Sequence, residues 1–279
     1  MSTKNKLINA GIYVILSVMA VIWLTPIVWI LLCSLRKEQG ADISYFWPKE
    51  FSLINYKNLL KSDTFYFPRW MGNTLFVAVF SCILSTLYVL MVSYAFSRLR
   101  FKLRRPLMNI VLILGMFPGF MSMIAVYYIL KALNMTQTLL ALILVYSGGA
   151  GLSYYIAKGF FDTIPKSLDE AARIDGASNS QVFWKIILPL SKPIILYTIL
   201  TSFMAPWMDF IFVSIIMKDN YDKYTVALGL YRMLERENMN TYFTRFCASS
   251  IIVAIPITAV FLGMQRFYIE GVTGGSVKG

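Results

Sequence analysis

Residues that could carry out chemistry are scarce in this chain. It has no histidine among its 279 residues, so it lacks both an imidazole base and a histidine metal ligand. Cys33, Cys82 and Cys247 lack the close spacing of a metal site or a redox pair, and we interpret them as small core residues. The apolar segments contain no paired carboxylates, because Asp209 is the one acid within them. We therefore expect no catalytic residue, no bound metal and no cofactor in this chain.

The segments that would position such groups are long and apolar. Apolar residues make up 58% of the sequence and charged residues 14%, a balance that a core of this size cannot bury. Six runs of about 20 to 29 residues are almost free of charge, and each can cross a hydrocarbon core of about 30 Å as a helix. We expect spans at about 10–35, 72–97, 107–130, 138–158, 193–217 and 247–266. The sequence thus predicts an all-α, polytopic membrane protein with six transmembrane helices in a single domain, 1–279.

The short connection from Ser97 to Pro106 sets the expected orientation. It holds five basic residues and no acid, whereas the connection after the third span has Lys131 alone. Because Lys and Arg in short loops stay on the cytoplasmic side, we place this connection in the cytoplasm, and with six spans both termini as well. The segments 36–71 and 218–245 then lie outside. Topology also accounts for the net charge of +12, so we expect no nucleic-acid partner.

Several spans contain proline or glycine. These residues are Pro26, Gly115, Pro118, Gly119, Gly148, Gly149, Gly151, Pro206 and Pro256. Such helices are kinked or locally unwound, and in a bilayer irregular backbone is tolerated where protein or a water-filled cavity satisfies its polar groups. We therefore expect a packed bundle around a pathway. Gly115 and Gly119, four residues apart, fit a close helix contact equally well.

The polar interval between the fourth and fifth spans carries two short predicted helices within 165–189. Ser167, with Glu170 three residues later, has the form of a capping box that begins a helix continuing to about Asp175. Gly176 suits the left-handed residue that closes such a helix. The first predicted helix therefore ends in a tight turn.

Ser178 with Gln181 repeats the capping box and predicts the second helix. Its apolar face consists of Val182, Phe183, Ile186 and Ile187. We expect Pro189 to end it, because the residue before a proline is pushed out of the α region. A rigid hairpin between two spans could pass a push from a soluble subunit into the bundle. By periodicity alone it could also be an amphipathic hairpin that lies on the membrane.

Seven residues of this hairpin match the EAA-x3-G-x9-I-x-L-P signature, and in this the chain resembles permease subunits of ABC importers. The residues are Glu170, Ala171, Ala172, Gly176, Ile186, Leu188 and Pro189. The resemblance implies that the hairpin is the coupling helix that docks into a groove on a cytoplasmic ATPase. Glu170 would then face a basic residue of the ATPase, and Ala171 and Ala172 would form the close-packing face. Gly176 would supply the turn, with Asp175 beside it in the same contact.

Stretches outside the hairpin extend this resemblance over most of the chain. Residues 158–178 look like the carbohydrate branch of these importers, and the C-terminal part resembles the smaller permease of maltose and maltodextrin importers. The resemblance implies a tail, 267–279, that reaches into the ATPase dimer interface, and an outer loop that reaches toward the binding protein. The tail candidates are Gly274, Gly275, Val277 and Lys278, and the loop candidates are Leu230, Tyr231 and Tyr242. Lys278 is followed by Gly279 and not by Ser or Thr, so the tail does not match a phosphate-binding loop.

The resemblance also implies a set of partners. A second permease would complete the translocation pathway, two copies of an ATPase would bind ATP and Mg²⁺, and an extracytoplasmic binding protein would deliver an oligosaccharide. The implied location is the bacterial cytoplasmic membrane, where lipid surrounds the spans. We expect maltose or maltodextrin as the substrate, with raffinose-type and alginate-type sugars as alternatives. Asp209 and Trp207 could line the sugar route, or Asp209 could form a structural hydrogen bond to the partner permease.

Two other classes of function are compatible with hydropathy alone. An ion-coupled secondary transporter would normally carry several intramembrane ionisable groups, whereas this chain offers Asp209 alone. A scaffold protein would show no flux in any combination of subunits. If the chain is an importer permease, we expect flux only when all partner subunits and ATP are present.

Overall fold

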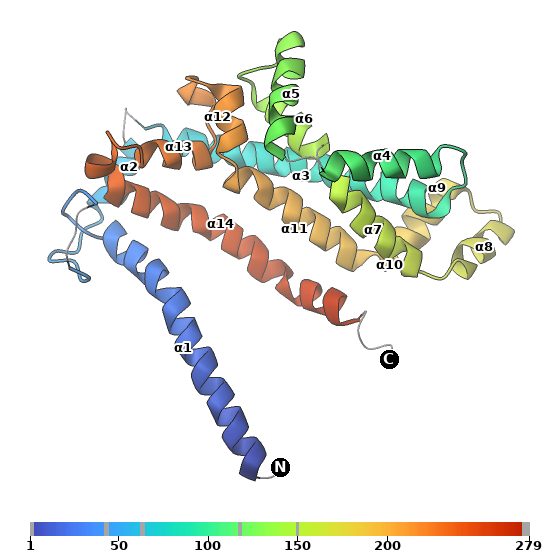
Figure 1. Ribbon diagram of the computed structural model, residues 1–279, viewed down its shortest axis with the longest axis horizontal. Helices are drawn as coiled ribbons and strands as arrows, with labels where there is room; N and C mark the ends of the chain where they lie inside the picture. The colour runs from blue at the N-terminus through green and yellow to red at the C-terminus, as the bar shows by residue number, and fades with distance from the viewer. Residues whose placement is uncertain (1–2, 42–44, 62–64, 117–118, 149–150, 275–279) are drawn as a thin grey trace. The chain divides into compact units, whose positions relative to one another are not determined.

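The structure is a computed structural model of the chain, and it describes residues 3–41, 45–61, 65–116, 119–148 and 151–274. Every named element within these ranges is helical (Figure 1), which confirms the predicted all-α class. Three helices are long and apolar enough to cross a membrane without a break. They are α1 (Thr3–Ser34), α3 (Phe67–Arg98) and α14 (Met239–Gly274). Pro26 lies inside α1 and Pro256 inside α14, and neither proline interrupts its helix.

Three further stretches are long and apolar enough when two neighbouring helical segments are taken together. They are α4 (Arg104–Met116) with α5 (Gly119–Ala132), α6 (Leu139–Gly148) with α7 (Gly151–Thr163), and the helical residues Asn179–Leu190 with α11 (Lys192–Met208). By length and composition the described helices therefore supply up to six spans. The boundaries of the six spans stay a prediction.

Two of these breaks fall at the predicted glycines. Gly119 begins α5, Gly148 ends α6 and Gly151 begins α7, while Pro118 and Gly149 lie outside the described residues. A Cβ placed on Gly115 or on Gly119 would meet no described atom within 4 Å. The described chain therefore makes no close helix contact at this pair of glycines.

The predicted fifth span, 193–217, is divided in the structure. α11 ends at Met208, which is the second residue after Pro206, and α12 (Ile211–Met217) follows. Upstream, the helical residues Asn179–Leu190 meet α11 at an angle of 83°. Asp209 therefore occupies a break between two helices and not the interior of one.

The chain divides into two compact units. The first comprises Met1–Phe67 and Gly229–Ile255, and the second comprises Pro68–Leu228 and Pro256–Gly279. The segments predicted as outer loops are partly helical, because they contain α2 (Ile54–Lys61), the short 3-10 helix η2 (Tyr221–Lys223), α13 (Val226–Met233) and the start of α14.

In the first unit, a buried amide organises the outer segment. The Nδ2 of Asn55 donates to the carbonyl oxygens of Ser34 at 3.0 Å and Arg36 at 2.6 Å. Its Oδ1 accepts a hydrogen bond of 3.0 Å from Thr244 Oγ1. These bonds fix α2 to the end of α1 and to the first turns of α14. Cys33 and Cys247 are also buried here, as is Cys82 in the second unit, which confirms their interpretation as core residues.

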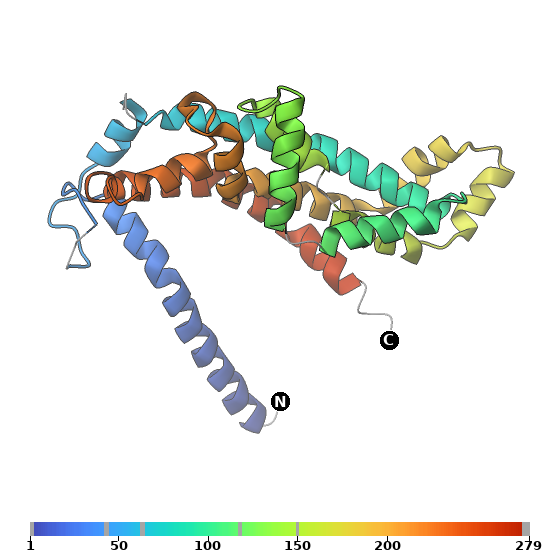
Figure 2. The same cartoon turned by 45° about the horizontal axis from the view of Figure 1, so that its top comes forward.

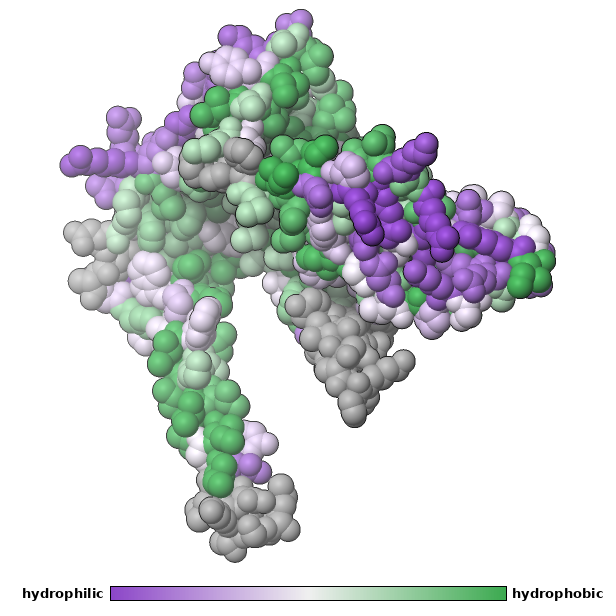
Figure 3. Space-filling model, turned by 45° about the vertical axis from the view of Figure 1, so that its right-hand side comes forward, coloured by the Kyte–Doolittle hydropathy of each residue, from purple (hydrophilic) through white to green (hydrophobic). Residues whose placement is uncertain are grey.

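In the second unit, the core joins α3, α7 and α11 to the predicted hairpin. Its buried residues are Val89, Leu90, Tyr94, Ala157, Phe161, Ile164, Val182, Phe183, Ile187 and Ile194. Figures 1 and 2 both show α8 (Ser167–Ile174) at the end of this unit, beyond the last turns of α3 and α7, while α9 (Asn179–Val182) packs against α3. Hydrophilic side chains gather over that end in Figure 3, whereas apolar side chains cover much of the neighbouring helical surface. The unit therefore has an apolar body and a polar end.

Candidate coupling hairpin

The turn of the hairpin is built around Gly176. Its φ of +85° confirms the predicted left-handed conformation. The N–H of Gly176 donates to the carbonyl of Arg173 at 3.0 Å, and the N–H of Ala177 donates to the carbonyl of Ala172 at 2.9 Å. These two bonds form a Schellman motif, which satisfies carbonyls that the end of α8 would otherwise leave unpaired.

The predicted capping box at the start of α8 is wrong. Lys166 already has helical backbone angles, with φ −68° and ψ −22°, and Ser167 is the first residue of the helix. The N–H of Glu170 bonds to the Lys166 carbonyl at 3.0 Å, and no side chain among the described residues caps this helix. The helix begins one residue earlier than predicted, and Glu170 is exposed on the surface.

The second capping box is confirmed. The backbone N–H of Ser178 donates to Gln181 Oε1 at 2.7 Å, and the N–H of Gln181 donates to Ser178 Oγ at 3.3 Å. Two backbone donors at the start of α9 are thereby satisfied reciprocally. The Schellman turn and this box fix both sides of the connection between the two helices.

The expectation that Pro189 ends the second helix is also wrong. After α9, the residues Phe183–Ile187 form a π-helical segment, η1, in which the N–H of Leu188 bonds to the carbonyl of Phe183. Pro189 lies inside α10 (Leu188–Leu190), in the first turn of a new α segment. Proline is tolerated there because its missing N–H has no obligatory partner in a first turn. The helical path instead changes direction around Ser191.

The apolar face of the second helix is packed into the bundle. Val182, Phe183 and Ile187 are buried, and the Phe183 ring lies 4.8 Å from that of Tyr94 in α3. Ile186, predicted for the same face, is half-buried. The hairpin is therefore anchored in protein along this face and does not depend on lipid to cover it.

The predicted coupling residues divide by exposure. Glu170, Ala171, Asp175, Gly176 and Pro189 are exposed, Ile186 and Leu188 are half-buried, and Ala172 packs against the core. On α8, Leu168 is 41% exposed and Ile174 is 87% exposed. Together with Ala171 they lie three residues apart, on one side of the helix. The two alanines predicted to form one packing face therefore have different surroundings, and α8 presents an apolar stripe beside the Glu170 carboxylate.

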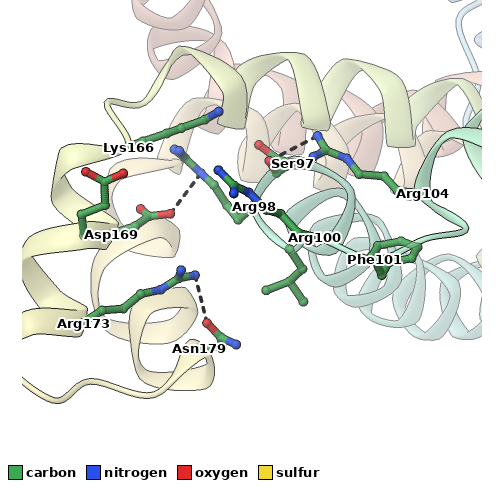
Figure 4. Close-up of a pocket in the computed structure, with 11 residues that line it drawn as sticks. Ser97, Arg98, Arg100, Phe101, Arg104, Lys166, Asp169, Arg173 and Asn179 are labelled. Carbon is green, nitrogen blue, oxygen red and sulfur yellow. Dashed lines mark hydrogen bonds and ion pairs between the residues drawn. The ribbon is translucent and has the colours of Figure 1, made fainter.

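Two charged residues that our sequence reasoning did not single out lie beneath this surface. A cleft of about 630 Å³ separates α8 from the end of α3 and the loop that follows it, and Arg98 and Asp169 face each other within it (Figure 4). Arg98 Nε lies 3.4 Å from Asp169 Oδ2, and the two side chains are 1% and 7% exposed. By sequence Arg98 is one of five basic residues in a single short connection. No local sequence signal marks its partner.

Asp209 has a structural role within the chain. Its Oδ1 accepts a hydrogen bond of 2.9 Å from the N–H of Phe212 in the first turn of α12, and its Oδ2 accepts one of 3.0 Å from the hydroxyl of Tyr146 in α6. Trp207, two residues before it, is buried and packs against Phe203. Both carboxylate oxygens therefore have partners inside the described chain.

The remaining predicted residues lie on the outer segment and the tail. Leu230 is half-buried and Tyr231 exposed on α13, and Tyr242 packs against Phe65 with ring centroids 4.6 Å apart. Gly274 is the last residue of α14. The other tail candidates, Gly275, Val277 and Lys278, lie outside the described residues.

Comparison with known proteins identifies the family of this chain. Residues 91–272, which include the whole hairpin, match the family described as the inner membrane component of binding-protein-dependent transport systems. The chain belongs to this family. It is therefore a non-catalytic permease subunit of an ABC importer in the inner membrane, with several spans, and ATP is hydrolysed by a separate ATPase. Such a subunit works with a partner permease and a binding protein.

Individual relatives match the chain over nearly its whole length. The galactooligosaccharides transport system permease protein GanQ of Bacillus subtilis is 34% identical, covering 96% of this chain and 94% of that protein. The maltose/maltodextrin transport system permease protein MalG of Escherichia coli is 32% identical, covering 100% and 98%. A crystal structure of a bacterial ABC transporter that imports alginate has a chain with a TM-score of 0.82, at 21% identity and covering 96% of this chain. That likeness shows the permease fold.

Proposed function

We propose that this permease imports an oligosaccharide, and that the hairpin of α8 and α9 couples import to ATP hydrolysis. The observation that carries the proposal is the construction of the hairpin. Its buried apolar face fixes it to α3 and α7, while Glu170, Ala171 and Ile174 are exposed and face away from the core. A rigid element that is anchored on one side and open on the other suits the transmission of a push.

In the proposed cycle, two ATPase copies close on ATP and Mg²⁺ and move the hairpin of each permease. The exposed apolar stripe of α8 would enter a groove on the ATPase, and the Glu170 carboxylate would meet a basic residue at its edge. The Schellman turn at Gly176 and the Ser178 capping box would keep the hairpin from bending under this load. The permease pair would then switch between inward and outward access.

Orientation and the outer contacts are part of the same proposal. The basic connection after α3 supports a cytoplasmic hairpin and cytoplasmic termini. The tail residues Gly274, Gly275, Val277 and Lys278 would then be available to the ATPase dimer. Leu230, Tyr231 and Tyr242 would lie outside, where the binding protein delivers sugar. We assign no sugar contact to Asp209, because its two oxygens are occupied within the chain.

For the substrate, we propose maltodextrins. The support is the similarity to MalG over the whole chain. A second candidate, galactooligosaccharides, is favoured by the 34% identity to GanQ. Both are neutral chains of hexose units, so the choice between them depends on the binding protein as well as on this subunit.

The test is ATP hydrolysis by the complete complex in lipid nanodiscs. This chain is co-purified with its partner permease and ATPase, and the binding protein is added with maltotriose, a galactooligosaccharide, raffinose or no sugar. Stimulation by maltotriose alone supports the proposal in full. Stimulation by the galactooligosaccharide alone keeps the mechanism and replaces the substrate. If no ATPase co-purifies and the isolated chain takes up sugar with an ion gradient, the coupling mechanism is refuted.

A further inference from the structure

Besides its apolar packing, the hairpin has polar contacts with α3 that its sequence signature does not include. One is the ion pair between Arg98, in the last turn of α3, and Asp169 in α8, at 3.4 Å. The other is the hydroxyl of Tyr94, one turn earlier on α3, which donates to the carbonyl of Asn179 in α9 at 3.2 Å. One helix of the bundle therefore holds both helices of the hairpin.

Arg98 is the centre of a wider junction. Its Nη2 donates to the carbonyl oxygens of Phe161 at 2.9 Å and Ile164 at 2.7 Å, at the end of α7. The neighbouring Ser97 donates from its hydroxyl to Asp162 Oδ1 at 2.6 Å. The end of α3 is thus bonded to α7 on one side and to α8 on the other, so a displacement of α8 acts on α3 and α7 together.

Burial makes the Arg98–Asp169 pair costly to break. With side chains 1% and 7% exposed, the two charges are shielded from water and from salt, and each is costly to leave without the other. The two neighbouring carboxylates of α8 differ in burial: Asp169 is buried, whereas Glu170 is exposed. The surface carboxylate is free to meet a partner, whereas the buried one is committed to the chain.

The geometry of the pair is incomplete. Asp169 Oδ1 and both Nε and Nη1 of Arg98 are buried and have no hydrogen-bond partner within the described part of the chain, so the 3.4 Å contact is an ion pair without a hydrogen bond. An arginine fork can bind a carboxylate through two parallel hydrogen bonds, which are shorter than the 3.4 Å separation seen here. A shift of α8 toward α3 would be needed to form such a fork, so the strength of this link depends on the position of α8.

We propose that α3 is the element of this chain that receives the movement of the hairpin, through the Arg98–Asp169 pair and the bond from Tyr94 to Asn179. Arg98, Asp169 and Tyr94 are positioning residues in this proposal, since they touch neither sugar nor ATP. The inference rests on the proposed coupling function and adds the path by which the push enters the bundle. It predicts that coupling can be lost while the ATPase still binds.

The experiment compares Asp169→Asn with Glu170→Gln in the nanodisc complex. Two quantities are measured: the amount of ATPase that co-purifies, and the stimulation of ATP hydrolysis by sugar-loaded binding protein. For Asp169→Asn we expect unchanged co-purification and a loss of stimulation of about fivefold or more, the lower range of a coupling between two sites. For Glu170→Gln we expect weaker co-purification, because the substitution removes the exposed charge.

Arg98 could also matter because its charge helps to set the membrane topology. A second experiment separates this role from the proposed one by moving the charge to another position in the same connection. Leu103 is 62% exposed in the same connection, so Arg98→Gln combined with Leu103→Arg keeps five basic residues there. Leu103→Arg alone is the matched control. We expect the double variant to insert correctly and to lose stimulation, and the control to retain it. Full stimulation in the double variant would overturn the proposal.

A second variant covers the case in which Asp169→Asn does not accumulate in the membrane. Tyr94→Phe keeps the ring on Phe183 and removes the hydroxyl that reaches Asn179. We expect partial loss of stimulation with normal co-purification. Unchanged stimulation in either variant would refute transmission through α3. Failure of the proposed function gives a different result, because the unsubstituted complex would then show no stimulation by any sugar.

Discussion

Substitution of Gly176 tests whether the coupling hairpin depends on a backbone conformation or on free space. Gly176 has a φ of +85°, and a Cβ built on it would meet no described atom within 4 Å. Gly176→Ala therefore introduces no clash within the described chain. It does place an L-residue in the left-handed region, which costs roughly 1–2 kcal/mol. That free energy corresponds to about a 5- to 30-fold increase in the population of the opened turn.

Gly176→Asn is the informative comparison. Asparagine is larger than alanine but occupies the left-handed region more readily, since its side chain can bond locally. If conformation governs this position, the order of function is Gly, then Asn, then Ala. Hydrogen exchange at the Ala177 amide, which bonds to the Ala172 carbonyl, reports the opening directly. Sugar-stimulated ATP hydrolysis reports its effect on coupling.

The reverse order would refute this reasoning. If Gly176→Asn loses more stimulation than Gly176→Ala while its Ala177 amide stays protected, the side chain is excluded by a neighbouring surface. The space that is open in this chain would then be filled by the ATPase, and the glycine would be required for close approach.

Three further substitutions test the other interactions. Ser178→Ala removes one half of the capping box and should lower the stability of the hairpin by about 1 kcal/mol, and a double-mutant cycle with Gln181→Ala should show that the two effects are not additive. Asp209→Asn retains an acceptor for the N–H of Phe212, so we expect it to keep normal sugar specificity. Asp209→Ala should lower the melting temperature of the complex more than Asp209→Asn does. Altered sugar specificity in Asp209→Asn would instead assign a sugar contact to Asp209. Asn55→Ala leaves two carbonyls and the Thr244 hydroxyl without their buried partner, and it should destabilise the outer segment by about 2 to 3 kcal/mol, measured as increased protease sensitivity; no change would show that water replaces the amide.

Local signals in the sequence predicted the hairpin well where the structure is locally determined. The turn at Gly176 and the box from Ser178 to Gln181 depend on residues within a few positions, and both are confirmed. The structure begins α8 one residue earlier than the capping box predicts, because the Ser-x-x-Glu spacing does not show whether the serine caps the helix or lies in its first turn. Pro189 does not end the second helix as predicted, because the π-helical segment η1 before it packs into the bundle, and residue spacing does not indicate that packing.

Long-range pairs were beyond the reach of sequence patterns. Asp209 is identifiable in the sequence as an acid in an apolar run. Its hydrogen-bond partner Tyr146 lies 63 residues away, and no pattern in either segment indicates that the two residues meet. Arg98 was counted with the neighbouring basic residues, since the rule for topology weighs charges by number and not by burial. The structure separates it from them, because Arg98 is buried whereas Arg100 lies on the surface.

To transmit movement, the hairpin must be rigid, attached to α3 and accessible to the ATPase. Different residues provide each of these properties. Gly176 and the Ser178 box provide rigidity, Arg98 and Asp169 provide attachment, and Glu170 lies on the open surface. Because the three sets do not overlap, their substitutions should fail in different ways. A softer hairpin should lose stimulation gradually with temperature, and a detached hairpin should lose it while still binding the ATPase. A hairpin with an altered surface should lose the ATPase itself. Measuring assembly and stimulation on the same preparations distinguishes these outcomes, and a single pattern shared by all three sets would contradict the division of roles.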